Sequence, residues 1–254
     1  MFTSNLSARE FVLAEQEKAV PIRQVMGNSV YKIANQIVGV RLATGEIKGL
    51  MRPLRDVYLH AIFRMQREAQ ELGAHAVIGV RLDEKRKYGQ LWTPKNIIDV
   101  KATGTAVALD RKDVPEKPAL SGLSGQEFYA LRRTGYTPIG LVFGQSVYYQ
   151  LSQRASVSPT PPGVSALDWG RVNLNTERTD YTQAVAKARH LAMKRLETEA
   201  NYLGAEGVVS ISVKTRRALM GDDLLVEFMA LGTAIVSHGP LRCAAGHLVS
   251  LGER

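Results

Sequence analysis

The sequence predicts a chain of two tandem units that each combine helices with strands. Residues 6–31 align without a gap with residues 123–148, at an offset of 117 positions (148 minus 31), and share the letters LS, EF, PI and SVY. The phrase E-A-x-x-L-G-A closes a helical pattern in each half, at 68–74 and 199–205, and a G-T-A phrase follows it in each half. The same signals in the same order twice indicate two folding units of one kind.

The first unit shows the expected elements in order. The letters SAREFVLAEQEKA (7–19) predict a short helix, and RQVMGNSVYKIA (23–34) and NQIVGVRLATG (35–45) predict two strands. A long helix follows, then a strand AVIGVRL (76–82) and a further strand that ends in GTA. Each unit is therefore expected to run short helix, strand, strand, long helix, strand, strand.

The long helix is predicted by its apolar periodicity. Apolar residues recur at steps of three and four from Leu54 to Leu72, and Pro53 precedes them where a first helical turn tolerates proline. The same face stays apolar 131 positions later (203 minus 72). Gly73 and Gly204 follow the last leucine of each helix, where a left-handed C-cap favours glycine.

The repeat sets the expected domain boundaries. The first repeat covers 1–113, a charged and proline-bearing linker covers 114–122, the second repeat covers 123–240, and a tail covers 241–254. The growth of the offset from 117 to 131 places an insertion near 152–180 of the second repeat. Its Pro, Ser, Gly and Asn content predicts a long surface loop.

Composition narrows the class of protein. The 254 residues are 45% hydrophobic with a formal net charge of +9, spread over both halves. Cys243 is the only cysteine, which excludes an intrachain disulfide and a four-cysteine zinc site and favours a reducing compartment. The first twenty residues carry charges where a signal peptide needs an apolar core, and no stretch approaches the roughly 20 apolar residues that span a bilayer. We expect a cytoplasmic protein with no membrane partner.

The repeated phrases resemble a known family. EAQELGAHAVIGVRLD followed by VKATGTAVAL, and EANYLGAEGVVSISV followed by EFMALGTAI, are similar to the YbjQ-like family, bacterial proteins labelled as putative heavy-metal-binding domains. The resemblance covers the core of both units. It implies an α+β fold of two dodecin-like units, in which an antiparallel sheet packs against one long helix. It also implies homo-oligomeric rings, pentamers in particular, in which the two repeats alternate or form stacked rings.

The family label suggests that the protein binds a transition-metal ion, and histidine, cysteine and glutamate side chains are the candidate ligands. No histidine corresponds to a histidine in the other unit, and His75 corresponds to Glu206. These two could bind an ion together across a ring interface, or their position could accept any polar residue just past the helix. Cys243 and His247, in CAAGH, have a spacing compatible with a metal clip. The candidate ligands are therefore His75, Glu206, Glu68, Glu199, Cys243 and His247.

The polar residues shared by both units do not form a catalytic constellation. Ser29 and Tyr31 alternate with a valine and so face the same side of a strand, without a shared histidine, an acidic dyad or a nucleophile elbow. Arg64–Glu68 and Arg195–Glu199 stand four apart on the helices, a spacing that favours ion pairs. We expect that the chain is not an enzyme.

Basic residues provide an alternative function. One inter-strand loop of each unit is rich in cations, and a ring would repeat this basic rim with aromatic residues available for stacking. A solvated loop would have the same composition. The candidate nucleic-acid-binding residues are Arg81, Lys85, Arg86, Lys87, Tyr88, Lys214, Arg216 and Arg217. The sequence thus predicts a non-enzymatic, ring-forming binding or scaffold protein for heavy metal, with nucleic acid or another polyanion as the alternative ligand.

Overall fold

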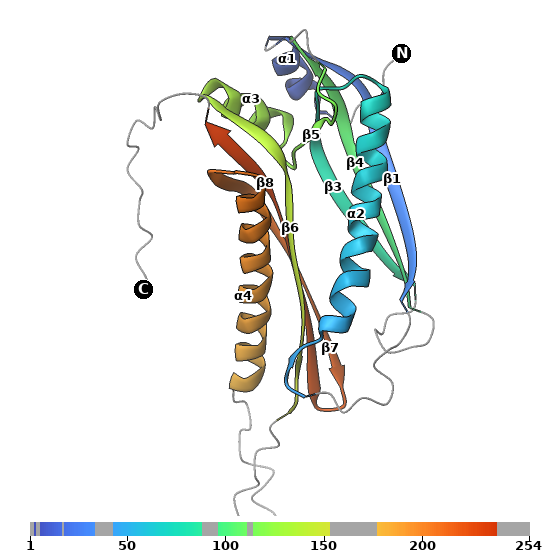
Figure 1. The fold of residues 1–254 in the computed structure, drawn as a ribbon, viewed down its shortest axis with the longest axis vertical. Coiled ribbons are helices and arrows are strands. Elements are labelled where there is room, and N and C mark those ends of the chain that lie inside the picture. The colour runs from blue at the N-terminus through green and yellow to red at the C-terminus, as the bar shows by residue number, and fades with distance from the viewer. Residues whose placement is uncertain are drawn as a thin grey trace, which may run out of the picture.

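The computed structural model describes residues 3, 6–16, 18–33, 43–87, 96–110, 114–152 and 177–237, and it confirms two tandem α+β units (Figure 1). The elements of unit 1 are α1 (Ala8–Gln16), β1 (Ala19–Ile33), α2 (Lys48–Glu71), β3 (Ala76–Lys87) and β4 (Asn96–Leu109). Those of unit 2 are α3 (Gly125–Arg133), β6 (Tyr136–Gln150), α4 (Thr179–Tyr202), β7 (Gly207–Met220) and β8 (Asp223–Ser237). Two short strands, β2 (Gly45–Glu46) and β5 (Ala119–Leu120), complete the two sheets.

The two sheets have the same central topology. Their strand orders are β1-β4-β3-β5 and β2-β6-β8-β7, and all pairs are antiparallel except β3 with β5. The register shifts at Pro21/Arg23 in unit 1 and at Pro138/Gly140 in unit 2, which are equivalent positions of the repeat. The same register shift therefore occurs in the first strand pair of both units.

A glycine in the first strand of each unit lets the long helix approach the sheet. A Cβ atom on Gly27 would lie 2.0 Å from the carbonyl oxygen of Ala61 in α2, and one on Gly144 would lie 2.0 Å from that of Ala192 in α4. No side chain fits at this distance from a backbone atom. Close packing of helix on strand explains why glycine occurs at this position in both units.

The helix predictions are confirmed at one end and corrected at the other. Gly73 and Gly204 adopt φ values of 68° and 72°, as a left-handed C-cap requires. Helix α2, however, begins at Lys48, so Pro53 lies inside the helix and not in its first turn. The extra turn is stabilised by Leu50, which is buried on the same face as the apolar stripe.

The strand predictions were incomplete because two segments cross between units. Strand β1 covers the first predicted strand, whereas most of 35–45 lies outside the described residues and its last residue, Gly45, belongs to β2. Strand β2 pairs with β6 of unit 2, and β5, within the predicted linker, pairs in parallel with β3. Sequence periodicity cannot show which sheet a two-residue strand joins.

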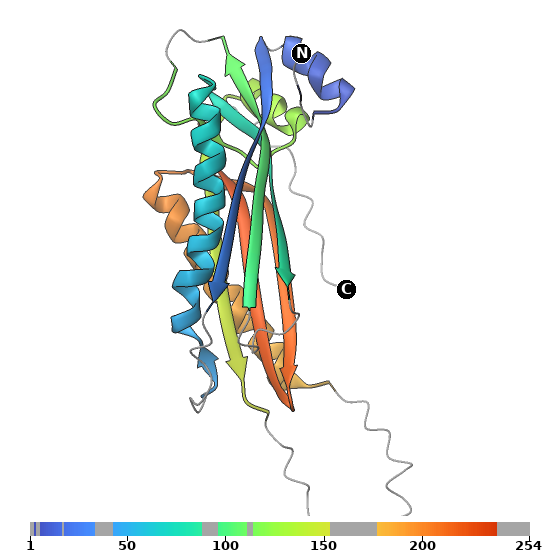
Figure 2. The same ribbon diagram turned by 90° about the vertical axis from the view of Figure 1, so that its right-hand side faces the viewer.

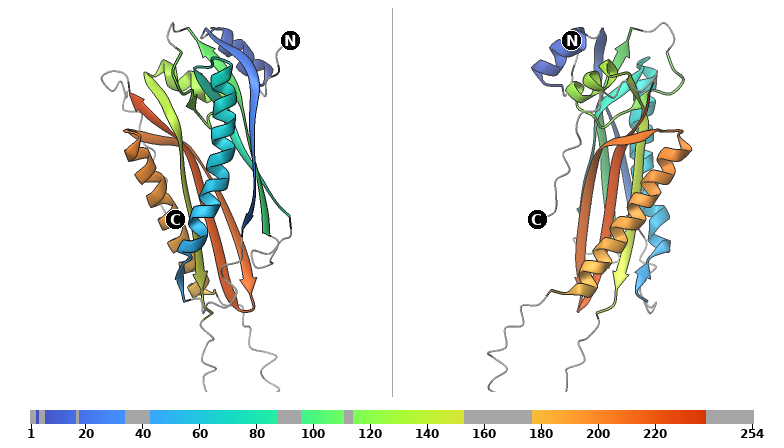
Figure 3. Two further views of the ribbon diagram at one scale, coloured as in Figure 1. Left: turned by 45° about the vertical axis from the view of Figure 1, so that its right-hand side comes forward. Right: turned by 90° about the vertical axis from the view of Figure 1, so that its left-hand side faces the viewer.

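Helix α2 lies between the two sheets, whereas α4 lies on the outside of the molecule (Figures 1 and 3). The largest core cluster joins α2 and unit 1 strands to Phe143, Val147, Leu225 and Met229 of unit 2. A second cluster fills the space between α4 and its own sheet. In Figure 2, β1, β4 and β3 face the viewer and no long helix crosses in front of them. Among the described helices, none is long and apolar enough to cross a membrane.

Candidate functional site

The candidate functional site is the interface between the two units, where apolar packing and ion pairs occur together. Apolar packing forms its centre: the rings of Tyr58 in α2 and Phe143 in β6 lie 5.2 Å apart between centroids, at an angle of 39°. Beside them, Val80 and Leu82 of β3 are buried in the same cluster as Met229 of β8. Unit 1 therefore covers strands β6 and β8 on one face of the unit 2 sheet.

An arginine–carboxylate pair fastens one edge of this interface. Arg195 of α4 binds both carboxylate oxygens of Glu46 in β2, at 2.5 and 2.8 Å, and also donates to the carbonyl oxygen of Gln145 at 2.7 Å. The hydrogen bond to Glu46 raises the pKa of Arg195 above its ordinary value, although burial acts in the opposite direction. The next residue, Ile47, donates its backbone N–H to the carbonyl oxygen of Val147 at 2.9 Å. A bidentate pair of this kind adds geometric specificity as well as energy.

Further polar contacts join β3 to β7. Arg216 donates to Glu84, which also accepts a hydrogen bond from the Tyr58 hydroxyl, and Lys214 donates to the carbonyl oxygen of Leu82. Only 3% of the Glu84 side chain is exposed, so its charge is largely removed from water and needs these partners. These contacts attach part of the predicted basic rim to the other unit.

The structure gives His75 and Glu206 the same structural role. Nδ1 of His75 accepts the backbone N–H of Leu109 at 3.2 Å, and a carboxylate oxygen of Glu206 accepts the backbone N–H of Ser237 at 3.2 Å. Leu109 and Ser237 are repeat-equivalent, at an offset of 128 (237 minus 109), and end the last strand of each sheet. Each side chain thus satisfies the final donor of its sheet. A histidine nitrogen and a glutamate oxygen can each accept a hydrogen bond, which explains why this position tolerates either residue.

Glu68 and Glu199 also have one shared role. Glu68 accepts the backbone N–H of Met26 at 2.8 Å, and Glu199 accepts the equivalent N–H of Phe143 at 2.9 Å. Glu199 also pairs with Arg55 of unit 1 at 3.1 Å. The predicted ion pairs along the helices are wrong: the glutamates bind strand amides, because the preceding turn of each helix lies directly over the first strand.

The arginines bind the strand in the same way. Arg64 donates to the carbonyl oxygen of Asn28, and Arg195 donates to that of Gln145, its equivalent in β6. Each helix therefore holds the first strand of its unit with one arginine and one glutamate, at positions where the glycine brings the two elements together. This explains why both residues are present in both units.

The described residues do not assemble the predicted metal site. Cys243 and His247 lie outside the described residues, and within the described ranges no three His, Cys, Asp or Glu side chains converge as metal ligands. Because Nδ1 of His75 accepts a hydrogen bond, the neutral ring carries its proton on Nε2, which is buried and has no lone pair for a metal. Within one chain, the four described candidates therefore accept backbone N–H groups and stay separate from one another, and a metal site shared between subunits stays a prediction.

The remaining sequence candidates are dispersed. Ser29 and Tyr31 both face α2, and Tyr31 meets Nδ1 of His60 at 2.7 Å. Of the predicted basic rim, Arg81, Lys85 and Arg217 are exposed. Tyr88 lies outside the described residues, and the side chains of Arg86 and Lys87 are likewise undescribed.

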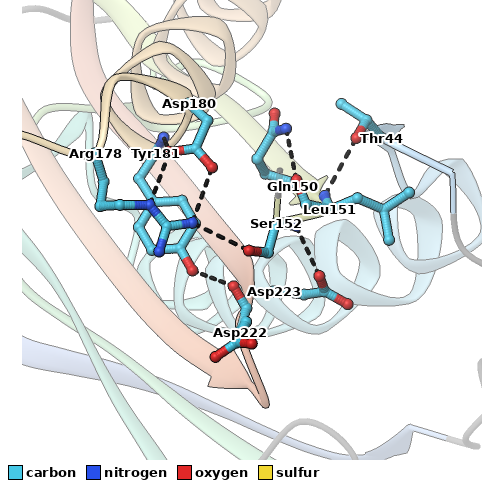
Figure 4. Close-up of polar contacts among 9 residues, drawn as sticks. All are labelled: Thr44, Gln150, Leu151, Ser152, Arg178, Asp180, Tyr181, Asp222 and Asp223. Atoms are coloured by element: carbon cyan, nitrogen blue, oxygen red, sulfur yellow. Dashed lines mark hydrogen bonds and ion pairs between the residues drawn. The ribbon is translucent and has the colours of Figure 1, made fainter. Parts of the chain in front are cut away.

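The start of α4 is fixed to its own sheet (Figure 4). Arg178 donates to Asp180 and, at 3.2 Å, to the hydroxyl of Ser152 after β6, while Tyr181 donates to the carbonyl oxygen of Asp222 between β7 and β8. On the other side of the view, the Thr44 hydroxyl of unit 1 accepts the backbone N–H of Leu151. Residues 178–181, at the start of α4, are thus held in place.

The repeat-equivalent faces of the two sheets differ in what covers them. On β6, Phe143 and Val147 are 3% and 0% exposed because unit 1 lies on them. On β1, the equivalent Met26 and Val30 are 45% and 63% exposed. We call the second surface the open face. Sequence reasoning missed both this face and Glu46, although the offset of 131 extends back to Glu46 and pairs it with Glu177.

Comparison with known proteins assigns the fold to a family. The family model described as "Putative heavy-metal-binding" (YbjQ_1) matches residues 12–110 and 172–238. The first match covers most of unit 1, and the second covers α4, β7 and β8 of unit 2. The gap between them contains α3, β6 and the segment 152–171 of the predicted insertion.

Relatives match either most of this chain or a part of it. The chain is 34% identical over 239 residues to "Encapsulin nanocompartment protein Rv1762c" of Mycobacterium tuberculosis, which covers 92% of this chain and 85% of that protein. It is 40% identical over 91 residues to "UPF0145 protein Ta0182" of Thermoplasma acidophilum, covering 35% of this chain and 70% of that protein. It is also 40% identical over 70 residues to a UPF0145 protein of Thermotoga maritima, covering 28% and 60%.

Proposed function

This chain belongs to the YbjQ-like family, and we propose that it is a non-enzymatic scaffold protein that assembles head to tail with copies of itself. One observation carries the proposal: Met26 and Val30 are exposed where the equivalent Phe143 and Val147 are covered by unit 1. A second copy that places its α4 and β7 on the open face would cover it in the same way.

The opposite end of the molecule carries the matching surface. In unit 1, Val80 and Leu82 of β3 are buried against unit 2. Their equivalents on β7, Ile211 and Val213, are exposed. Beside Ile211, α4 and β7 border a groove of about 420 Å³ that also includes Met193. The molecule therefore has both halves of its internal interface open, one at each end.

Such a contact is heterologous, so repetition gives a closed ring or an open filament. The ring implied by the family is a closed form. Because each chain contributes two units, a ring of whole chains contains an even number of units, and five-fold symmetry then requires five chains. The relative named as an encapsulin nanocompartment protein supports a role in assembly.

Light scattering on two valine variants tests the proposal. The wild-type chain should show one species at a whole-number multiple of 27.9 kDa. Val30→Lys should reduce that mass toward a single chain because it puts a charge into the open face, whereas Val114→Lys, at an exposed valine of the linker, should not. A wild-type mass of 27.9 kDa at all concentrations would contradict assembly.

Metal binding stays a prediction, and only Cys243 and His247 remain as unassigned candidates. His75, Glu206, Glu68 and Glu199 already accept backbone N–H groups. Calorimetry with zinc, copper and nickel is the test: binding should disappear in Cys243→Ser and persist in Glu206→Gln. Binding that persists without the cysteine would reject the tail as the site.

Polyanion binding is the second candidate, supported by one feature. A groove of about 430 Å³ beside the start of α4 is lined by Arg178, Arg189 and Arg217. Shift assays with single-stranded and duplex DNA should show binding that weakens as salt rises, because phosphate contacts release counterions. Arg217→Ala should weaken it. Lack of salt-sensitive binding would exclude this function.

A further inference from the structure

We infer that Glu177 of one copy binds Arg64 of the next copy and fastens the junction between chains, as Glu46 binds Arg195 within a chain. The inference rests on the proposed head-to-tail assembly and specifies its partner, its direction and its central contact. Both residues are described, and both lie at repeat-equivalent positions: Arg64 and Arg195 are 131 apart, and so are Glu46 and Glu177.

Arg64 shares the strand contact of its counterpart Arg195 but has no carboxylate partner within the described chain. Both arginines donate to the equivalent carbonyl oxygen of the first strand, of Asn28 in one unit and of Gln145 in the other. Arg195 then uses its two terminal nitrogens on Glu46. Arg64 is exposed, and no described carboxylate lies within ion-pair distance of it. Its strand contact already orients the guanidinium for a bidentate partner.

Glu177 is presented as Glu46 is. Each glutamate lies two residues before the first residue of a long helix. The intervening residues have nearly the same backbone angles: Ile47 has φ −86° and ψ 82°, and Arg178 has φ −80° and ψ 83°. Equal backbone angles direct the two carboxylates alike relative to their helices. Glu177 is exposed, and its described side-chain partner is the hydroxyl of Thr182, at 2.7 Å.

The strand next to Arg64 has an open edge for the same segment. In unit 2, β6 carries β2 on its outer edge, and the N–H of Ile47 binds the carbonyl oxygen of Val147. In unit 1, β1 is the terminal strand of the described sheet. The equivalent contact joins the N–H of Arg178 in one copy to the carbonyl oxygen of Val30 in the next. Addition to an open strand edge is a common mode of protein association.

The inference sets the order of units in the assembly. Glu46 is already bound inside its own chain, so the free carboxylate belongs to unit 2 and the free arginine to unit 1. Each junction therefore places unit 2 of one copy on unit 1 of the next, and the two repeats alternate in one ring. Rings made of one repeat each would leave both charges unpaired at these positions.

Charge reversal provides the test, with mass measured by light scattering. Arg64→Glu alone places two carboxylates at every junction, and Glu177→Arg alone places two guanidinium groups there. The dissociation constant between chains should rise about ten- to a hundredfold in each variant, as expected for the loss of charged hydrogen bonds. The double variant Arg64→Glu/Glu177→Arg should reassemble, because every junction then regains one carboxylate and one arginine, whatever the number of chains in the assembly.

The outcomes separate the pairing from the assembly itself. Circular dichroism checks that each variant is folded, and Glu116→Arg in the exposed linker is a charge-matched control that should restore nothing when it is combined with Arg64→Glu. Assembly of both single variants at wild-type strength, or no recovery in the double variant, would overturn the pairing and leave head-to-tail assembly intact. A wild-type chain that is a monomer would overturn the proposed function, and the pairing with it.

Discussion

The covered face of the unit 2 sheet and the open face of the unit 1 sheet are built on equivalent strands in opposite surroundings. Where unit 2 has Leu141, Met229 and Leu231, unit 1 has Gln24, Lys101 and Thr103 at the equivalent positions. The face that unit 1 covers is the more apolar, and the open face has Met26 and Val30 among polar residues. Interfaces that form between folded partners commonly combine an apolar centre with polar neighbours. Under the proposed assembly, the internal contact would be permanent and the contact between chains reversible.

The largest expected difference concerns the aromatic centre of the covered face. Phe143→Ala should lower the free energy of unfolding by about 3–5 kcal/mol, because it leaves a cavity against Tyr58. Met26→Ala, at the equivalent open position, should change the stability of a single chain by about 0.5 kcal/mol or less. Urea unfolding in the Val30→Lys background, which keeps chains apart, measures both. Similar losses in the two variants would mean that the faces are equally buried.

The two arginines should differ by a smaller amount. Arg195→Ala leaves the Glu46 carboxylate, which is 10% exposed, without its bidentate partner, and should cost about 1.5–3 kcal/mol. Arg64→Ala removes an exposed side chain and should cost about 0.5 kcal/mol or less in the same background. Thermal and urea unfolding check the difference. If Arg64→Ala lowered the free energy of unfolding as much as Arg195→Ala does, Arg64 would already have a strong partner within the single chain, which would contradict this account.

A third pair of equivalent residues lies at the bulge in β3 of unit 1 and in β7 of unit 2. Gly79 and its equivalent Ser210 both have positive φ, 65° and 52°. A residue with a Cβ is strained there, so Ser210→Gly should stabilise the chain by about 0.5 kcal/mol and Gly79→Ser should destabilise it by about 1 kcal/mol. Stability curves of the two variants are the measurement. A loss of stability in Ser210→Gly would show that the serine side chain contributes more than the strain costs.

The smallest effect concerns the contact between the two short helices. Burial raises the pKa of Glu10, but hydrogen bonds from Ser7 and from the backbone of Gly125 and Gln126 outweigh it, so the pKa lies below its ordinary value of 4.5. A lowered pKa stabilises the fold above 4.5 and loses that contribution as the pH falls through the folded-state value. Glu10→Gln should therefore be less stable than wild type at neutral pH. The gap should narrow below pH 4.5, and a gap that is the same at both pH values would contradict this.

The sequence predicted the elements within each unit better than the contacts between units. The offset of the repeat identified both long helices, their glycine C-caps and the strands around GTA, because these depend on local periodicity. It did not predict that β2 would cross to the other sheet, since a two-residue strand has no period of its own.

The roles of individual polar residues also could not be predicted from the sequence. His75 and Glu206 differ in chemistry, and only the structure shows that each accepts the last N–H of its sheet. The i,i+4 spacing of Arg64 and Glu68 suggested an ion pair, but the close approach at Gly27 directs both side chains to the strand. Glu46 and Glu177 could have been found by extending the alignment backward from the long helix.

Disulfide trapping tests most directly whether the internal interface is repeated between chains. In a Cys243→Ser background, Ile47→Cys with Val147→Cys places two thiols inside one chain on backbone segments that an N–H···O bond of 2.9 Å already joins. Val30→Cys with Arg178→Cys places them at the equivalent positions of the open edge. Under oxidation, denaturing gels should show single chains for the internal pair and covalent dimers and longer products for the external pair. Oxidation of the internal pair without interchain products from the external pair would contradict head-to-tail assembly.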